Sequence, residues 1–416
     1  MTALGDNVRI NSARLWDSLM EMARIGPGIA GGNNRQTLTD ADSEGRHLFK
    51  RWCEAAGCSM GLDSMGNMFA TRAGTDPDAA PVYIGSHLDT QPTGGKFDGV
   101  LGVLAGLEVV RTMNDLGIRT RHPVVVTNWT NEEGARFAPA MLASGVFAGI
   151  HTEDYAKGRT DLDGKVFGEE LKRIGWVGDE KVGARKMHAM FEYHIEQGPI
   201  LEAEGKEIGV VTHGQGLWWL EITLTGKDAH TGSTPMNMRV NAGLGMARIT
   251  ERVHQIAMAH QPNAVGAVGQ VKVFPNSRNV IPGKVIFTVD IRSPEQAKLD
   301  AMRAEVERAA HAVAKELGLG CSIEPVGHFD PVTFDPTLVK RVRDTAERLG
   351  LSHMDIVSGA GHDACWINRV APTVMIMCPC VDGLSHNEAE EISEEWAARG
   401  ADVLFHAVVE TAGVVS

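Results

Sequence analysis

The sequence predicts an α/β protein of two domains, in which a smaller α+β domain interrupts a larger α/β domain with a mixed sheet. Three observations carry this prediction: the length of 416 residues, the alternation of short apolar runs with longer helical patterns, and a change of pattern near Thr212. One hydrophobic core rarely organises more than about 300 residues. We therefore expect residues 1–211 and 327–416 to form the first domain, and residues 212–326 an inserted second domain.

The first domain is expected to contain a strand–helix–strand unit. The apolar runs VYIGSH (82–87) and PVVVTNWT (123–130) are typical of buried strands. Residues 99–116 between them carry apolar side chains at helical spacing, and Gly117 suits the end of that helix. Ligands of open α/β sheets gather at the carboxyl ends of the strands, so residues just beyond these two runs are candidate site residues.

The inserted domain is expected to have the β-α-β-β-α-β order of a ferredoxin-like fold. Its predicted elements are strand 218–226, helix 241–260, strands 267–274 and 284–293, helix 295–317 and strand 321–328. The α/β pattern then returns with helix 335–349, strand 371–378 and a final amphipathic helix over 391–413.

Composition excludes several classes of function. No apolar run approaches the roughly 20 residues that span a bilayer, and the net charge of −13 offers no basic stripe for nucleic acid. The first residues do not resemble a secretory signal, and six scattered cysteines fit reduced thiols, so we expect a cytoplasmic protein with a small-molecule substrate. Cys378 and Cys380 have the spacing of a soft-metal pair, but their surroundings favour a buried strand.

Two motifs follow the first predicted strand. In GSHLDT, His87 and Asp89 alternate along an extended segment, so the Asp89 carboxylate can orient the imidazole of a metal-binding histidine. In GGKFDG, Asp98 sits at a turn whose glycines allow the backbone to approach a cation. Taken alone, the same residues also fit an Asp-Gly turn beside a surface histidine.

Three further motifs offer ligands. TNWTNEEG ends the second strand with Glu132 and Glu133, of which one can bind a metal while the other acts as a general base. HIEQGP contributes His194, and LSHNE contributes His386. Each motif alone also fits a structural or surface position. Together they form the mixed nitrogen and oxygen ligand set that suits zinc, manganese, cobalt or nickel.

The order HxD, GxxDG, EE, HxEQGP and SHNE resembles the amidase, hydantoinase and carbamoylase branch of the M20 metallopeptidase family, over essentially the whole chain. This branch includes N-carbamoyl-L-amino-acid hydrolases, β-ureidopropionase and allantoate amidohydrolase. The peptidase members usually carry an acid where this chain has His194, so HIEQGP favours the carbamoylase branch.

The resemblance implies a pair of divalent metal ions bridged by Asp98. It assigns His87 and His194 to one ion, Glu133 and His386 to the other. It makes Glu132 the base, with Asp89 supporting the site. It implies that the inserted domain is a lid, which also joins two subunits into a homodimer and supplies His230, Asn279 and Arg292. His230 would stabilise the oxyanion from the partner's lid. Further substrate contacts are implied for Gln197, Gly361 and His362.

The implied reaction is removal of the carbamoyl group from a ureido acid, either an N-carbamoyl-L-amino acid or N-carbamoyl-β-alanine. The alternatives within the family are allantoate hydrolysis and, less favoured because of His194, a peptidase. A binding protein that keeps the fold without catalysis is the alternative from another class, although every expected ligand and the base are present.

Overall fold

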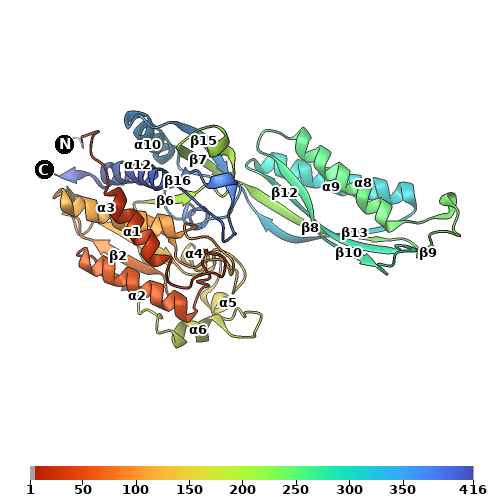
Figure 1. Cartoon of the computed structure of the whole chain (residues 1–416), viewed down its shortest axis with the longest axis horizontal. Coiled ribbons are helices and arrows are strands. Elements are labelled where there is room, and N and C mark those ends of the chain that lie inside the picture. The colour runs from red at the N-terminus through yellow and green to blue at the C-terminus, as the bar shows by residue number, and fades with distance from the viewer. Residues whose placement is uncertain (1–4, 416) are drawn as a thin grey trace. The chain divides into compact units, whose positions relative to one another are not determined.

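The computed structural model describes residues 5–415 and divides into two compact units, coloured along the chain in Figure 1. Unit 1 comprises Met1–Thr212 and Phe334–Ser416, and unit 2 comprises His213–Thr333. The second boundary lies seven residues beyond the expected one, because strand β13 (Gly320–Phe329) continues past residue 326 and β14 (Val332–Thr333) follows it.

Unit 1 is built on a mixed sheet in the order β1-β2-β5-β3-β6-β16-β7-β14, with β15 also paired to β7. Its further strands are β1 (Ser59–Leu62), β2 (Met68–Arg72), β3 (Val82–His87), β5 (Val124–Trp129), β6 (Ala189–Ile195), β7 (Ile208–Gly214), β15 (His353–Ser358) and β16 (Thr373–Cys378). The central strands β5, β3, β6 and β16 run parallel, whereas β1, β2, β7 and β14 pair antiparallel. This arrangement confirms the predicted fold class.

The longer helices of unit 1 are α1 (Ser12–Met22), α2 (Asp40–Ala55), α3 (Val100–Asp115), α10 (Pro336–Arg348) and α12 (Glu394–Ala412). α1, α3 and α10 pack against α12, which also contacts β6 and β16. α3 is apolar and buried along most of its length. Leu116 is its C-cap, and Gly117 follows in the left-handed region, as predicted. Asp335 caps α10 by accepting hydrogen bonds from Thr337 and Leu338.

Shorter elements complete unit 1. They are α4 (Leu142–Phe147), α5 (Glu153–Lys157), α6 (Phe167–Arg173), α7 (Ile200–Ala203), α11 (Asp363–Ile367), the 3₁₀ turn η2 (Val381–Gly383), and the paired strands β4 (Arg119–Thr120) and β17 (Val414–Val415). Cys378 ends the buried strand β16 and Cys380 is also buried, so the predicted strand is present. No helix within residues 5–415 is both long and apolar enough to cross a membrane.

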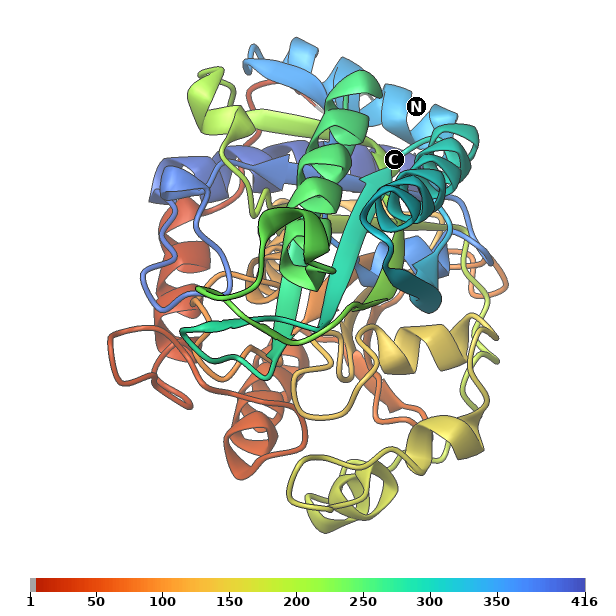
Figure 2. The same ribbon diagram turned by 90° about the vertical axis from the view of Figure 1, so that its right-hand side faces the viewer.

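Unit 2 has the predicted β-α-β-β-α-β order. Its four-stranded sheet runs β10-β12-β8-β13, all pairs antiparallel, with α8 and α9 packed side by side against the strands (Figures 1 and 2). The elements are β8 (Gly216–Thr225), α8 (Ala242–Ala259), β10 (Val265–Phe274), β12 (Lys284–Ser293) and α9 (Gln296–Leu317), with the smaller β9 (Ala229–His230), β11 (Val280–Ile281) and η1 (Met236–Met238). Alternate residues of β12, from Val285 to Ile291, enter the core, as the period of a strand requires.

Candidate metal centre

Neighbouring parallel strands of unit 1 end at one edge of the sheet, and the predicted ligands lie there. β3 pairs in parallel with both β5 and β6. His87 is the last residue of β3, the two glutamates follow β5, and His194 is near the end of β6. The turn before α3 adds Asp98, and the segment between β16 and α12 adds His386. Five ligand candidates from five separate parts of the chain therefore converge.

One group of candidate ligands joins His87, Asp98 and His194, all three buried. Oδ1 of Asp98 lies 3.2 Å from Nε2 of His194 and 3.7 Å from Nε2 of His87. Nδ1 of each imidazole lies within 2.9 Å of a backbone carbonyl, that of Asp89 for His87 and that of Ile195 for His194. A carbonyl only accepts hydrogen bonds, so each Nδ1 donates and Nε2 of each ring is the atom that faces Asp98. Burial lowers the pKa of His87 to about 4. For His194 burial also lowers the pKa, but the hydrogen bond and the charge of Asp98 outweigh it and raise the pKa to about 9.

A second group joins Asp98, Glu133 and His386. Nε2 of His386 lies 3.5 Å from Oδ2 of Asp98 and 3.5 Å from Oε2 of Glu133. Oδ1 of Asp98 therefore faces the first group, and Oδ2 faces the second.

This donor set fits divalent cations. When the imidazoles are neutral, as metal ligands must be, their Nε2 lone pairs and the carboxylate oxygens that face them repel unless a positive charge lies between them. Burial raises the pKa of Glu133 well above its ordinary value, and the negative charges of Asp98 and Asp89 raise it further. Nitrogen and oxygen ligands together suit the first-row divalent metals. The described residues thus offer two adjoining metal positions that share Asp98.

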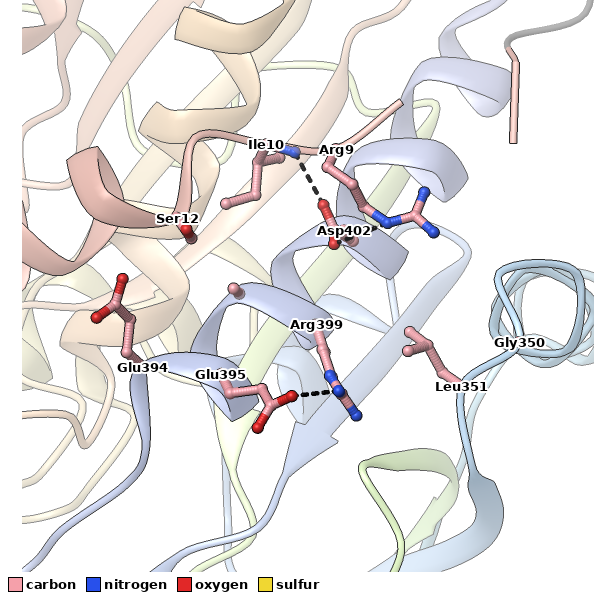
Figure 3. Close-up of a pocket in the computed structure, with 10 residues that line it drawn as sticks. Arg9, Ile10, Ser12, Gly350, Leu351, Glu394, Glu395, Arg399 and Asp402 are labelled. Carbon is pink, nitrogen blue, oxygen red and sulfur yellow. Dashed lines mark hydrogen bonds and ion pairs between the residues drawn. The ribbon is translucent and has the colours of Figure 1, made fainter. Parts of the chain in front are cut away.

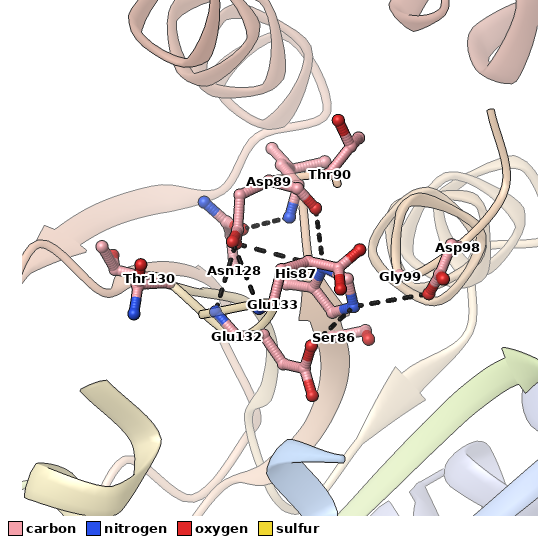
Figure 4. A network of polar contacts seen from close by, with 12 residues as sticks. Ser86, His87, Asp89, Thr90, Asp98, Gly99, Asn128, Thr130, Glu132 and Glu133 are labelled. Atoms are coloured by element: carbon pink, nitrogen blue, oxygen red, sulfur yellow. Dashed lines mark hydrogen bonds and ion pairs between the residues drawn. The ribbon is translucent and has the colours of Figure 1, made fainter. Parts of the chain in front are cut away.

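Glu132 lies beside these groups without belonging to either. Its Oε2 is 3.4 Å from Nε2 of His87, and the residue is only 6% exposed (Figure 4). Burial raises the pKa of Glu132 well above its ordinary value, and the carboxylates of Asp363 and Glu133 raise it further. A carboxyl group with a raised pKa can both take up and release a proton near neutral pH, as a general base and acid must.

Asp89 supports the centre differently from the prediction. Nδ1 of His87 donates to the backbone carbonyl of Asp89 at 2.8 Å, whereas the carboxylate lies 4.0 Å away. The Asp89 carboxylate instead accepts the backbone N–H groups of Glu132 and Glu133, both at 3.3 Å (Figure 4). The expected alternation fails because β3 ends at His87, so Asp89 is no longer in extended pairing. Its carboxylate therefore holds the two-glutamate turn.

The predicted substrate contacts of unit 1 also lie at this edge. Gln197 donates through Nε2 to Oδ2 of Asp98 at 2.9 Å, and its Oε1 is buried without a hydrogen-bond partner among the described residues. His362 is buried with its ring 4.5 Å from the ring of His194, and Gly361 precedes it beside Met141. Burial lowers the pKa of His362 well below its ordinary value, so this imidazole is neutral at pH 7.

The remaining predicted contacts belong to unit 2. His230 of β9 pairs with Val280 of β11, so Asn279 is its close neighbour along that two-stranded sheet. Nδ1 of His230 accepts the backbone N–H of Gly232 at 3.0 Å. Arg292 lies near the end of β12 and donates to the carboxylate of Asp290, with a shortest distance of 2.7 Å. His230 and Asn279 are thus together, whereas Arg292 belongs to the separate four-stranded sheet.

Sequence reasoning missed several side chains that hold the ligands. Gln91 donates to Oε2 of Glu133 at 2.7 Å, and Ser385 donates to Oδ2 of Asp98 at 3.1 Å. Glu390 accepts a hydrogen bond from the backbone N–H of Asp98, and Glu192 accepts one from the hydroxyl of Ser86 at 2.6 Å. The one signal in the sequence that could have indicated them is nearness to a predicted site residue. Gln91, Ser385 and Glu390 each lie within five residues of a predicted ligand or of Asp89.

Gly99 leaves room for the His87 ring. Its φ is +69°, and a Cβ atom there would lie 2.3 Å from Cε1 and Nε2 of His87. We expect Gly99→Ala to lower the free energy of unfolding by about 2–4 kcal/mol, through the left-handed backbone and overpacking, and to weaken metal binding. Denaturant unfolding and elemental analysis measure the two effects.

Gly117→Ala is the matched control for Gly99→Ala. The φ of Gly117 is +63°, but no atom of the described residues lies within 4 Å of the position that its Cβ would take. The free energy of unfolding of Gly117→Ala should fall only by the backbone contribution of about 1–2 kcal/mol, and this variant should keep its metal. Equal metal content in the two variants would contradict the packing of Gly99 against His87.

A pocket of about 660 Å³ lies elsewhere on unit 1, between the N-terminal segment and α12. Arg9 pairs with Asp402 at 3.4 Å, Asp402 also accepts the backbone N–H of Ile10 at 2.8 Å, and Arg399 pairs with Glu395 (Figure 3). None of the predicted site residues lines it.

The chain matches known proteins over its whole length. Residues 83–410 match the model of Peptidase family M20/M25/M40. The chain is 77% identical to an N-carbamoyl-L-amino-acid amidohydrolase of Rhizobium meliloti over 415 residues, which cover 100% of both chains. It is 36% identical to an N-carbamoyl-L-amino acid amidohydrolase of Geobacillus stearothermophilus, covering 97% of this chain and 99% of the other.

A solved structure also matches this chain over nearly its whole length. The crystal structure of an amidase of the hydantoinase/carbamoylase family from Burkholderia multivorans superposes with a TM-score of 0.96 at 55% identity, covering 97% of this chain and 98% of that chain. The chain therefore belongs to Peptidase family M20/M25/M40 and, within it, to the hydantoinase/carbamoylase branch that its motifs predicted.

Proposed function

We propose that this protein is a metal-dependent amidohydrolase that cleaves N-carbamoyl-L-amino acids to the free amino acid, carbon dioxide and ammonia. The main support is Asp98, whose two oxygens each face a separate ligand group, with the carboxyl of Glu132 beside them. The full-length identity of 77% to an N-carbamoyl-L-amino-acid amidohydrolase supports the choice of substrate.

Two divalent ions of zinc, manganese, cobalt or nickel are the proposed cofactors. His87 and His194 would hold one ion and Glu133 and His386 the other, with Asp98 shared between them. When bound, such ions act as Lewis acids that polarise the scissile carbonyl and make the attacking water more acidic.

Glu132 is the proposed proton carrier. Its carboxylate takes a proton from the attacking water and then delivers it to the nitrogen of the leaving amine, so that one residue acts first as base and then as acid. Its raised pKa suits both steps. Asp89 keeps the carboxyl in place by holding the backbone N–H of Glu132.

Residues of both units are proposed to bind the substrate. The planar guanidinium of Arg292 matches a carboxylate, and Asn279 can donate and accept toward a carboxylate or ureido group. Oε1 of Gln197 is buried and has no hydrogen-bond partner within residues 5–415, so it suits a ureido N–H donor. Gly361 and His362 are proposed to complete the contacts, and His230 to stabilise the oxyanion.

The sheet of unit 2 supports a homodimer. Arg292 pairs with Leu217 at one end of β8, whereas Lys284 pairs with Thr225 at the other, and β9 with His230 follows beyond that second end (Figure 1). Eight residues of strand separate Arg292 from Lys284, or about 26 Å. One small substrate cannot touch both His230 and Arg292 of the same chain, so we infer that His230 serves the active site of a partner subunit.

A substrate panel tests the reaction. Metal-loaded protein should hydrolyse N-carbamoyl-L-amino acids faster than their D-enantiomers, N-carbamoyl-β-alanine, allantoate and dipeptides. Liberated ammonia and amino acid, measured together for each metal, identify both substrate and cofactor. Faster turnover of allantoate or of a dipeptide would overturn the proposed substrate.

Mixing two inactive variants tests the partner's role of His230. Glu132→Gln and His230→Ala proteins, each inactive alone, are expected to regain about a quarter of wild-type activity once their subunits exchange, because half of the dimers then hold one complete site. If His230 acted within its own chain, the mixture would stay inactive. Mixing each variant with itself is the control.

A further inference from the structure

Glu390 joins two segments that are distant in the sequence. Its Oε1 accepts the backbone N–H of Phe97 at 3.0 Å and that of Asp98 at 3.1 Å. The residue is only 4% exposed, and it lies four positions after His386 in the segment that leads to α12. One buried carboxylate therefore connects the turn that carries Asp98 to the segment that carries His386.

The fit around this carboxylate is close. A Cβ atom at Gly95 would lie 2.0 Å from Cδ and Oε1 of Glu390, so only glycine allows the turn to wrap around it. Ser385 extends the connection, because its hydroxyl donates to Oδ2 of Asp98 at 3.1 Å and lies 3.5 Å from Oε2 of Glu390.

A second carboxylate anchors the same segment from another side. Oε2 of Glu388 accepts the backbone N–H groups of Ala30 at 2.5 Å and Gly32 at 3.2 Å. The next residue of that loop, Asn33, exchanges two backbone hydrogen bonds with Gly94, at 2.9 and 3.0 Å. Hydrogen bonds therefore join three segments into one network: the loop at 30–33, the turn at 94–98 and the segment at 385–390.

This network of hydrogen bonds sets the position of His386, which lies in the segment between β16 and α12 and not on a strand. The residue is half exposed and has a φ of +53°, a conformation that a residue other than glycine keeps only where its surroundings impose it. Strand ends place His87 and His194, whereas His386 and Asp98 depend on the hydrogen bonds of Glu388 and Glu390.

We propose that Glu390 is a positioning residue that fixes the distance between Asp98 and His386, and thereby the metal affinity of the position they share. Glu388 assists it by anchoring the same segment. This inference rests on the metal-binding part of the proposed function and is independent of the substrate. Removing an outer partner of a ligand commonly weakens metal binding by about 10–100-fold.

Calorimetric titration of chelator-stripped protein with Mn²⁺ tests the proposal without using activity. Glu390→Ala should bind one of the two ions at least about tenfold more weakly than wild type. Glu390→Gln should stay within about threefold, because the amide oxygen still accepts both N–H groups. Glu388→Ala should give a smaller loss, and Glu391→Ala, an exposed position in the same segment, should give none.

Gly95→Ala provides a second route to the same carboxylate. This substitution displaces the side chain of Glu390 without removing it, so it should also weaken the binding of Mn²⁺. The test therefore stays decisive if Glu390→Ala does not fold. Wild-type affinity in folded Glu390→Ala or in Gly95→Ala would overturn the positioning role, as would a Glu390→Gln variant as weak as Glu390→Ala. Failure of the wild-type protein to bind Mn²⁺ or another divalent ion would instead overturn the proposed function.

Discussion

Turnover of N-carbamoyl-L-amino acids is expected to fall about 10³-fold when Glu132 is replaced by glutamine, which is within the usual contribution of a general acid–base. The amide fills the same volume but cannot take up the proton of the attacking water. Glu132 lies outside both ligand groups, so the variant should bind metal as the wild type does. Steady-state kinetics of the metal-loaded variant, together with elemental analysis, measure both quantities.

The control for Glu132→Gln is Glu391→Gln, which removes the same charge at an exposed position and should leave kcat unchanged. Near-normal turnover of Glu132→Gln with its metal retained would show that another group moves the proton. A variant that lost its metal would instead show that Glu132 is a ligand.

Metal and activity are expected to be lost together when Asp98 is replaced by alanine. One oxygen of Asp98 faces His87 and His194, and the other faces Glu133 and His386, so a single substitution removes a ligand from both positions. Affinity should fall by more than about 100-fold, the upper end of the effect of losing a group that merely supports a ligand. Calorimetric titration with Mn²⁺ and elemental analysis after dialysis measure the loss.

Asp98→Asn is the matched comparison, because the amide keeps the shape and one oxygen ligand. It should retain metal at one position better than at the other. If Asp98→Ala still bound two ions tightly, the shared-ligand arrangement would be wrong, and the two groups would have to act independently.

Much of the fold followed from local pattern. The buried strands 82–87 and 124–129 were predictable because uninterrupted apolar runs bounded by turn residues are typical of central parallel strands. The inserted unit was predictable because its strands alternate, as β12 does, and its helices have their own period. The end of unit 2 was predicted too early, because the sequence does not show that β13 continues to Phe329 and that β14 follows.

The candidate site divided in the same way. Ligand types and their order were readable because each motif ends a strand or forms a turn. The role of Asp89 was only partly readable, since its position relative to His87 depends on where β3 stops pairing. For Glu390 the sequence offered only its position four residues after His386, because its partner Asp98 lies 292 residues away in the chain.

By itself the sequence determined the two-unit α/β architecture, the set of histidines and carboxylates, and the branch of the family, because these depend on residue type and short-range periodicity. Only the tertiary structure decided which oxygen of Asp98 faces which ligand group, that the Asp89 carboxylate holds the glutamate turn, and that Glu390 ties the Asp98 turn to the His386 segment. The physical reason is that hydrogen bonds between distant segments form only where packing of the whole unit brings a buried carboxylate to unpaired backbone N–H groups.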